Sequence, residues 1–304
     1  MNDHALVDTA WLEQRLGDPQ VVVLDMRWRG DGTGRALWEH SHVPGAAHLD
    51  WSTDIVDPDG EFAFMLAPPA LFSAALERTG VGDDSVVIAY ADEGGSGPFR
   101  LWWAFRVYGH EDQVRVLDGG WERWAAEGRP VSADRSQPRA GVVWTPRPSA
   151  VRPATAGDVM DAARRPGVVV IDSRPPEQHA GRAVWFETGH VEPDAQGIAH
   201  TPRGDVRAGR IPWARSVPSA TLYRDDGTMK AREELRTVFA EAGVREGTEV
   251  ITQCGVGISA SAVLFALHRA GFDDARLYDA SWEEWGRRED LPVERDRSRP
   301  ERSR

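Results

Sequence analysis

Short runs of aliphatic residues, each ending in a polar residue, recur along the chain and alternate with longer amphipathic stretches. Residues 21–25, 86–90, 168–172 and 248–253 have the length and the valine and isoleucine content of buried strands. Residues 155–163, which begin with the capping residue Thr155, and the alanine-rich residues 259–270 are typical of helices. Because buried strands that alternate with helices form parallel sheets, the pattern predicts an α/β fold with helices on both faces of the sheet.

The second half of the chain repeats the order of features in the first half. The matched segments are residues 21–25 with 168–172, 42–46 with 210–214, 86–92 with 248–254, 101–105 with 263–267, and 116–124 with 277–285. We therefore predict two homologous domains, at residues 1–135 and 151–295, with a linker at 136–150 and a disordered tail at 296–304. Only the second half has an extra segment, about residues 183–205, which we expect to be a functional loop containing Trp185 and Phe186.

Cys254 is the only cysteine of the chain, and it lies between a predicted strand and a predicted helix. The N–H groups of such a loop and the start of the helix favour a thiolate, which is nucleophilic near neutral pH. Gly255 and Gly257 expose backbone where a buried structural cysteine would need side chains, so we expect Cys254 to be reactive. The matching position in the first half is Asp92, which predicts a non-catalytic first domain and one active site per chain.

Composition excludes several classes of function. A formal net charge of −12 over 304 residues disfavours binding to nucleic acid or to acidic membranes, and no run approaches the about 18 apolar residues of a membrane span. A single cysteine excludes a disulfide framework and any cysteine-based zinc or iron–sulfur site. The sulfur chemistry favoured below needs no metal and no organic cofactor, so we expect neither. A free thiol and the absence of a signal-peptide pattern in residues 1–16 predict a cytoplasmic protein.

The residues around Cys254 separate the possible thiol chemistries. Cysteine-dependent phosphatases need an arginine six residues after the nucleophile, where this chain has Ala260. Dithiol redox chemistry needs a second cysteine, and a hydrolase needs a histidine partner, whereas His268 is a full helix away. Sulfur-atom transfer needs only one thiolate and an anion-stabilising loop, so the sequence favours it.

The chain resembles tandem-domain rhodaneses and 3-mercaptopyruvate sulfurtransferases over about residues 6–293. The motifs that carry the resemblance are residues 43–46 (VPGA), 100–103 (RLWW), 117–121 (LDGGW) and 254–259 (CGVGIS). The resemblance implies two domains, each with a five-stranded, mostly parallel sheet flanked by helices, the second domain being catalytic. It also implies that Cys254 carries a persulfide and that the following loop residues bind the substrate, namely Gly255, Val256, Gly257, Ile258 and Ser259.

Within that family the motif is more similar to the mercaptopyruvate branch, because the thiosulfate branch has basic residues after the cysteine. The resemblance implies further substrate-binding residues: His42 matches a relay histidine, and Arg203 matches the second of two arginines that hold the substrate carboxylate. Gln178 occupies the position of the first arginine, and nearby Arg182 is the candidate to replace it. Val256 replaces the serine of the proposed relay, which leaves the donor undecided between thiosulfate and 3-mercaptopyruvate.

The leading functional hypothesis is therefore a sulfurtransferase that moves a sulfane sulfur to cyanide, a thiol or a protein through a Cys254 persulfide. The alternative is a persulfide carrier that hands sulfur to a partner protein with little turnover on free donors. A third, phosphatase-like hydrolysis, is disfavoured by Ala260. The expected partners are a small sulfur donor, a thiophilic acceptor and a sulfur-accepting protein, with no nucleic acid and no membrane.

Overall fold

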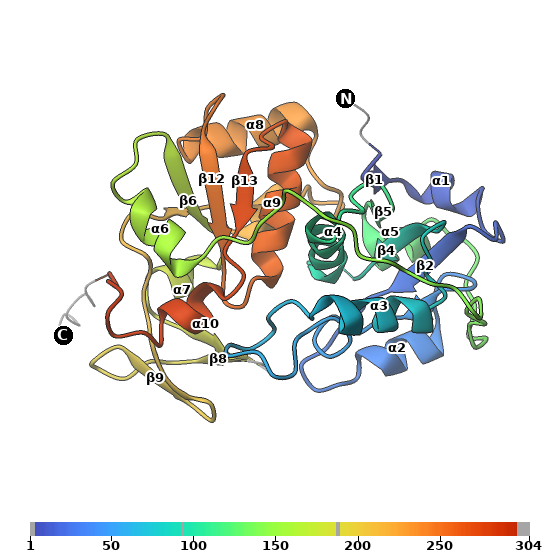
Figure 1. Cartoon of the computed structure of the whole chain (residues 1–304), viewed down its shortest axis with the longest axis horizontal. Helices are drawn as coiled ribbons and strands as arrows, with labels where there is room; N and C mark the ends of the chain where they lie inside the picture. Colours follow the sequence, from blue (N-terminus) through green and yellow to red (C-terminus); the bar gives the residue numbers. More distant parts are fainter. Residues whose placement is uncertain (1–3, 93, 187–188, 297–304) are drawn as a thin grey trace, which may run out of the picture.

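The computed structural model describes residues 4–92, 94–186 and 189–296, so residues 297–304 of the predicted tail lie outside the described part. Two α/β halves lie side by side, with the first half on the right of Figure 1 and the second on the left. A long linker without helix or strand crosses from one half to the other. The fold therefore follows the internal repeat.

The first half contains one parallel sheet of five strands. Its strands are β1 (Leu6–Val7), β2 (Val21–Asp25), β3 (Ala47–His48), β4 (Val86–Tyr90) and β5 (Val114–Leu117), in the order β1-β5-β4-β2-β3. The central strands are buried on both faces, as their continuous aliphatic sequence requires. The flanking helices are α1 (Thr9–Glu13), α2 (Gly34–His40), α3 (Pro69–Arg78), α4 (Gly97–Val107) and α5 (Gly120–Ala126).

The second half contains a parallel sheet of four strands. They are β6 (Val168–Asp172), β11 (Arg215–Ser216), β12 (Glu249–Gln253) and β13 (Ala275–Leu277), in the order β11-β6-β12-β13. The helices are α6 (Ala156–Ala162), α7 (Pro176–His179), the 3-10 helix η1 (Ser219–Leu222), α8 (Arg232–Glu241), α9 (Ile258–Ala270) and α10 (Ser281–Trp285). Two parallel sheets flanked by helices confirm the predicted fold class.

The fifth strand expected in the second sheet is reduced to one bridge in the described residues. Ala154 pairs in parallel with Tyr278, where β1 of the first half pairs with β5 over two residues. In the first half the N–H of Val116 donates to the Ala5 carbonyl at 2.8 Å, whereas in the second half the bridge rests on the N–H of Ala154, which donates to the Leu277 carbonyl at 2.8 Å. The prediction of five strands per domain therefore holds only for the first domain.

The extra segment of the second half folds into two antiparallel hairpins. β7 (Val184–Phe186) pairs with β8 (Gly189–Val191), and β9 (Ile198–Thr201) pairs with β10 (Gly204–Arg207). Ala199 and Val206 anchor the second hairpin in the apolar core of the second half. The side chain of Phe186 lies outside the described part of the structure.

The two halves meet along α4 and α9, which lie next to each other at the centre of Figure 1. Phe265 of α9 contacts Phe99 and Trp102 of α4, with ring centroids 5.0 and 4.9 Å apart. One apolar cluster includes residues of both halves, so the interface is a continuous core. This packing brings together the loops that precede α4 and α9.

Candidate active site

Cys254 directly follows β12 and is only 2% exposed. Its N–H donates to Ser281 Oγ at 3.1 Å, and its carbonyl accepts from the N–H of Trp282 at 3.0 Å. Ser281 is fully buried, has a φ of 51° and donates its own hydroxyl to the carbonyl of Tyr278 at 2.7 Å. The start of α10 therefore holds the backbone of Cys254 on both sides, which fixes the position of the thiol.

The loop after Cys254 turns sharply into α9. Gly257 has a φ of +76°, and a Cβ built there would lie 2.6 Å from the carbonyl oxygen of Asp279. Both the left-handed backbone and the close approach require glycine at this position. The first N–H groups of α9 have no partner within the helix, so they and the helix dipole can stabilise a negatively charged sulfur.

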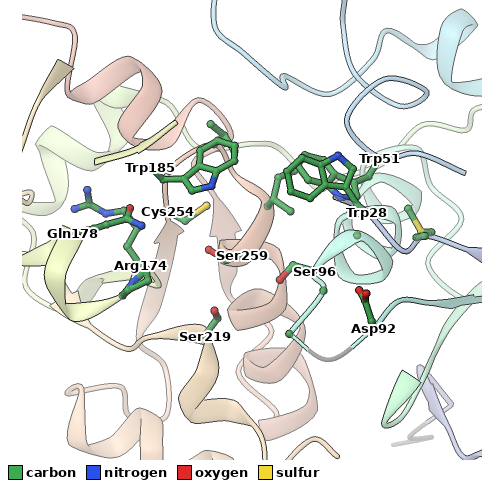
Figure 2. Close-up of a pocket in the computed structure, with 18 of the residues that line it drawn as sticks. Trp28, Trp51, Asp92, Ser96, Arg174, Gln178, Trp185, Ser219, Cys254 and Ser259 are labelled. Atoms are coloured by element: carbon green, nitrogen blue, oxygen red, sulfur yellow. The ribbon is translucent and has the colours of Figure 1, made fainter. Parts of the chain in front are cut away.

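The thiol opens onto a cavity of about 310 Å³ between the two domains. Figure 2 shows Trp185 next to Cys254, with Gln178 and Arg174 on the second-domain side and Trp28, Trp51, Ser96 and Asp92 on the first-domain side. Trp28 and Trp51 contact each other, with ring centroids 4.8 Å apart. A cavity of this size with three indole walls suits a small organic molecule rather than a macromolecule.

Three serine hydroxyls and one amide line the cavity, beside the charged Asp92 and Arg174 and the imidazole of His190. Ser259 Oγ lies 3.0 Å from Ser173 Oγ, and Ser219 lies on the same side of the cavity (Figure 2). The Gln178 side chain is 4% exposed, and its Nε2 lies 3.1 Å from His190 Nε2. The hydroxyls and the amide can form hydrogen bonds to a ligand without adding a full charge.

Arg174 also lines the cavity, but its charge is balanced by Asp172. Arg174 Nη2 lies 2.7 Å from Asp172 Oδ2, and the guanidinium lies over the Trp282 ring at 4.1 Å. Burial alone raises the pKa of Asp172, but the charge of Arg174 and hydrogen bonds from His179 and Arg174 lower it to about 2. Arg27 and Asp25 make the same pair under Trp121 in the first domain, so the motif is structural in both domains.

The structure brings four of the five predicted loop residues to the cavity. Gly255, Val256, Ile258 and Ser259 line it together with Cys254. Gly257 faces the other way, toward Asp279. Trp185, from the extra segment of the second half, also lines the cavity. Ala260 is fully buried. His268 lies in the last turn of α9, where its Nδ1 is 2.6 Å from Asp273 Oδ1.

The other three predicted substrate-binding residues, Arg203, Arg182 and His42, do not line this cavity, and their role in binding stays a prediction. Arg203 lies in the turn between β9 and β10 and binds Glu283 at 3.2 Å. Arg182 is exposed, 3.9 Å from Asp296. His42 is buried in the first domain, where Nδ1 lies 2.6 Å from the Trp38 carbonyl and the ring stacks on Trp38.

Comparison with known proteins identifies the family. The model of the Rhodanese-like domain matches residues 8–127 and 155–288. The chain belongs to the rhodanese-like family. The sulfur carrier protein TtuD of Thermus thermophilus is 30% identical to this chain, and the match covers 95% of this chain and 95% of TtuD. A thiosulfate sulfurtransferase of Rattus norvegicus is 32% identical, and the match covers 93% of this chain and 92% of the rat protein.

A solved structure agrees with this family. SseA from Escherichia coli, described as a 3-mercaptopyruvate sulfotransferase, is 27% identical and superimposes with a TM-score of 0.74, covering 91% of this chain and 98% of SseA. These comparisons confirm the predicted family, its tandem architecture and its link to sulfur transfer. They name both enzymes and a carrier, so the family alone does not choose between the two.

The first rhodanese-like domain has the same strand, loop and helix but no thiol. The structure corrects the predicted match, because Ala91 directly follows β4 where Cys254 directly follows β12. The N–H of Trp121 donates to the Ala91 carbonyl as the N–H of Trp282 donates to the Cys254 carbonyl. Asp92 is one residue further along the loop, and its carboxylate forms an ion pair with Arg29. Asp92, Gly95 and Ser96 nevertheless line the cavity around Cys254. The first domain, which has no cysteine, therefore supplies one wall of the cavity around Cys254.

Several residues of this site escaped sequence reasoning. Trp28, Trp51 and Met26 come from the first domain, and no local pattern shows that they face Cys254. Ser281 has a local signal, because it precedes the Trp282 that matches Trp121 of the repeat. No group of three or more His, Cys, Asp or Glu in the described ranges is arranged to hold a metal ion, and no helix there is long and apolar enough to cross a membrane.

Proposed function

We propose that the protein is a sulfurtransferase that carries the transferred sulfur as a persulfide on Cys254. The observation that carries the proposal is the position of the sole thiol: it is held rigidly at the start of α9 and borders a small cavity between the domains. A thiolate there attacks a sulfane sulfur, and the loop N–H groups stabilise the charge on the sulfur that it acquires.

The chemistry balances without a metal or an organic cofactor. With thiosulfate, the Cys254 thiolate attacks the outer sulfur, the S–S bond of the donor breaks and sulfite leaves with its electron pair. With 3-mercaptopyruvate, the C–S bond breaks and the enolate of pyruvate leaves and takes a proton. In the second half-reaction a nucleophile such as cyanide attacks the outer sulfur of the persulfide and regenerates the thiolate.

The cavity favours weak binding of small anionic donors. Arg174 is the only guanidinium among the described residues that line it, and Asp172 balances that charge. Donor binding must then rely on the loop N–H groups and on Ser219 and Ser259, as neither Gly255 nor Val256 is basic. We therefore expect measurable turnover with a high KM for both donors.

A second candidate function is the persulfide carrier. The 30% identity with the sulfur carrier TtuD supports it, as does Gln178 in the place of a substrate-binding arginine. A carrier would accept sulfur from one protein and pass it to another, with little turnover on free donors. The cytoplasmic location predicted from the free thiol suits either function.

Steady-state kinetics separate the two functions. We would measure kcat/KM for thiosulfate and for 3-mercaptopyruvate with cyanide as acceptor, with Cys254→Ala as the control for background transfer. Turnover on either donor well above the Cys254→Ala background supports the enzyme. A persulfide that forms but turns over no faster than this background supports the carrier, and failure to form any persulfide contradicts both.

A further inference from the structure

A buried ion pair crosses from the first domain to the second directly behind the Cys254 loop. Arg100 of α4 is fully buried, and its Nη1 binds the Asp279 carboxylate, which lies between β13 and α10. Arg100 Nη2 also donates to the Phe64 carbonyl at 2.9 Å, and its guanidinium lies 4.4 Å from the centroid of the Trp103 ring. The second oxygen of Asp279 accepts from the N–H of Leu66 at 3.0 Å.

This ion pair contacts the loop that carries the nucleophile. A Cβ on Gly257 would lie 2.7 Å from Asp279 Oδ1 and 3.1 Å from Arg100 Nη1. The backbone of Gly257 therefore rests on the ion pair, and Gly257 connects Cys254 to the first turn of α9. A shift of Asp279 would move the loop N–H groups relative to the thiol.

The reverse contact, in which Asp118 of the first domain meets the second domain, has no arginine at the position that matches Arg100. Asp118 of the first domain matches Asp279 in the repeat and accepts from the N–H of Met229 at 2.8 Å, as Asp279 accepts from Leu66. The position in α9 that matches Arg100 is Ala262. Each domain thus receives a backbone hydrogen bond from the other, but the arginines near Asp118, Arg269 and Arg123, come from other positions than the one that matches Arg100.

We propose that Arg100 is a positioning residue for the reaction, contributed by the domain that has no nucleophile. It holds Asp279, and Asp279 holds Gly257, so that the loop N–H groups point at the charge on the sulfur. Catalysis depends on donors placed in advance, and small displacements of such groups lower rates strongly. The proposal rests on the proposed function only in taking Cys254 as the reacting group.

The test compares Arg100→Gln and Asp279→Asn with the matched control Asp118→Asn. The first readout is the rate constant for alkylation of Cys254 by iodoacetamide, which needs no sulfur donor. We expect both variants to lower this rate constant, and kcat with thiosulfate, by about ten-fold or more, with little change in KM. Asp118→Asn should leave the alkylation rate constant within about two-fold of the wild type.

Thermal unfolding of each variant ensures that the rates are measured on folded protein, since loss of one partner of a buried ion pair destabilises a fold. If Arg100→Gln does not fold, Arg100→Lys keeps the charge and should show an intermediate alkylation rate. Wild-type alkylation rates in folded Arg100 and Asp279 variants would overturn the proposal, as would an equal loss in Asp118→Asn. If slow alkylation appears in the variants but no donor is turned over by the wild type, the positioning role stands and the enzymatic function fails.

Discussion

The two loops that follow β4 and β12 share a backbone plan but differ in what they present to the cavity. The first loop presents the Asp92 carboxylate, paired with Arg29, and the second presents the Cys254 thiol under Trp185. Both loops line the same cavity, although only the second has a thiol. The comparison teaches that a repeat without a thiol can still supply walls and support to the site of the other repeat.

Replacing the nucleophile should have the largest effect. Cys254→Ala removes the only thiol, so sulfur transfer should fall by at least about a thousand-fold, to background. Stability should change little, because alanine is small and apolar at a buried position. Thiocyanate formation from thiosulfate and cyanide measures the loss, and transfer near the wild-type rate would refute the role of Cys254.

Moving the thiol to the first domain tests whether the loop after β4 can replace the loop after β12 in sulfur transfer. In the double variant Cys254→Ala with Ala91→Cys, which puts the thiol directly after β4, we expect no transfer above that of Cys254→Ala alone. The first loop leads into α4, whose first turn contains Pro98, a residue without an N–H. The position that matches Arg100 in the other domain is Ala262, so no arginine from that position packs behind the first loop. The same thiocyanate assay decides the matter, and recovery of even a tenth of the wild-type rate would mean that the two loops differ only in the thiol.

Removing the wall that belongs to the second domain should have a moderate effect. Trp185→Ala opens the cavity beside Cys254, so kcat/KM should fall by about ten-fold, mainly through KM. Trp11→Ala is the matched control, because Trp11 is also a partly buried indole but does not line the cavity. Equal effects of the two substitutions on KM would contradict the assignment of Trp185 to the site.

The smallest expected effect concerns the carboxylate at the end of β6. The folded-state pKa of Asp172 is lowered to about 2, so its stabilising contribution is complete above the unfolded pKa near 4 and is lost as the pH falls toward 2. This contribution amounts to roughly 2 kcal/mol. We would measure the free energy of unfolding in urea at pH 4 and at pH 2. The decrease between these two pH values should be smaller in Asp172→Asn than in the wild type. An equal decrease would contradict the stabilising role of the Asp172 carboxylate.

The local features of the catalytic loop were predictable from sequence because they depend on neighbours in the chain. The aliphatic run before Cys254, the glycines at 255 and 257 and the helix that follows determine the strand, turn and anion site. The fifth strand of the second sheet was the exception, because only Ala154 pairs there, with Tyr278, where the repeat suggested a strand like β1. Pattern alone does not give the length of an edge strand.

The contacts between the domains were not predictable in the same way. Trp28, Trp51 and Arg100 reach the site only because α4 packs on α9, and no periodicity in the sequence reveals that pairing. Two positions transferred from the family lie outside the cavity, because a nearby partner holds each side chain elsewhere. Glu283 holds Arg203, and Trp38 holds His42 in the core of the first domain.

The central claim is that one loop of the two carries sulfur, and it can be tested by mass spectrometry of the protein after incubation with thiosulfate or 3-mercaptopyruvate. We predict the gain of one sulfur atom, located on the peptide that contains Cys254, and its disappearance after cyanide is added. No gain with either donor under conditions where another rhodanese-like protein is loaded, or a sulfur that cyanide does not remove, would contradict the account.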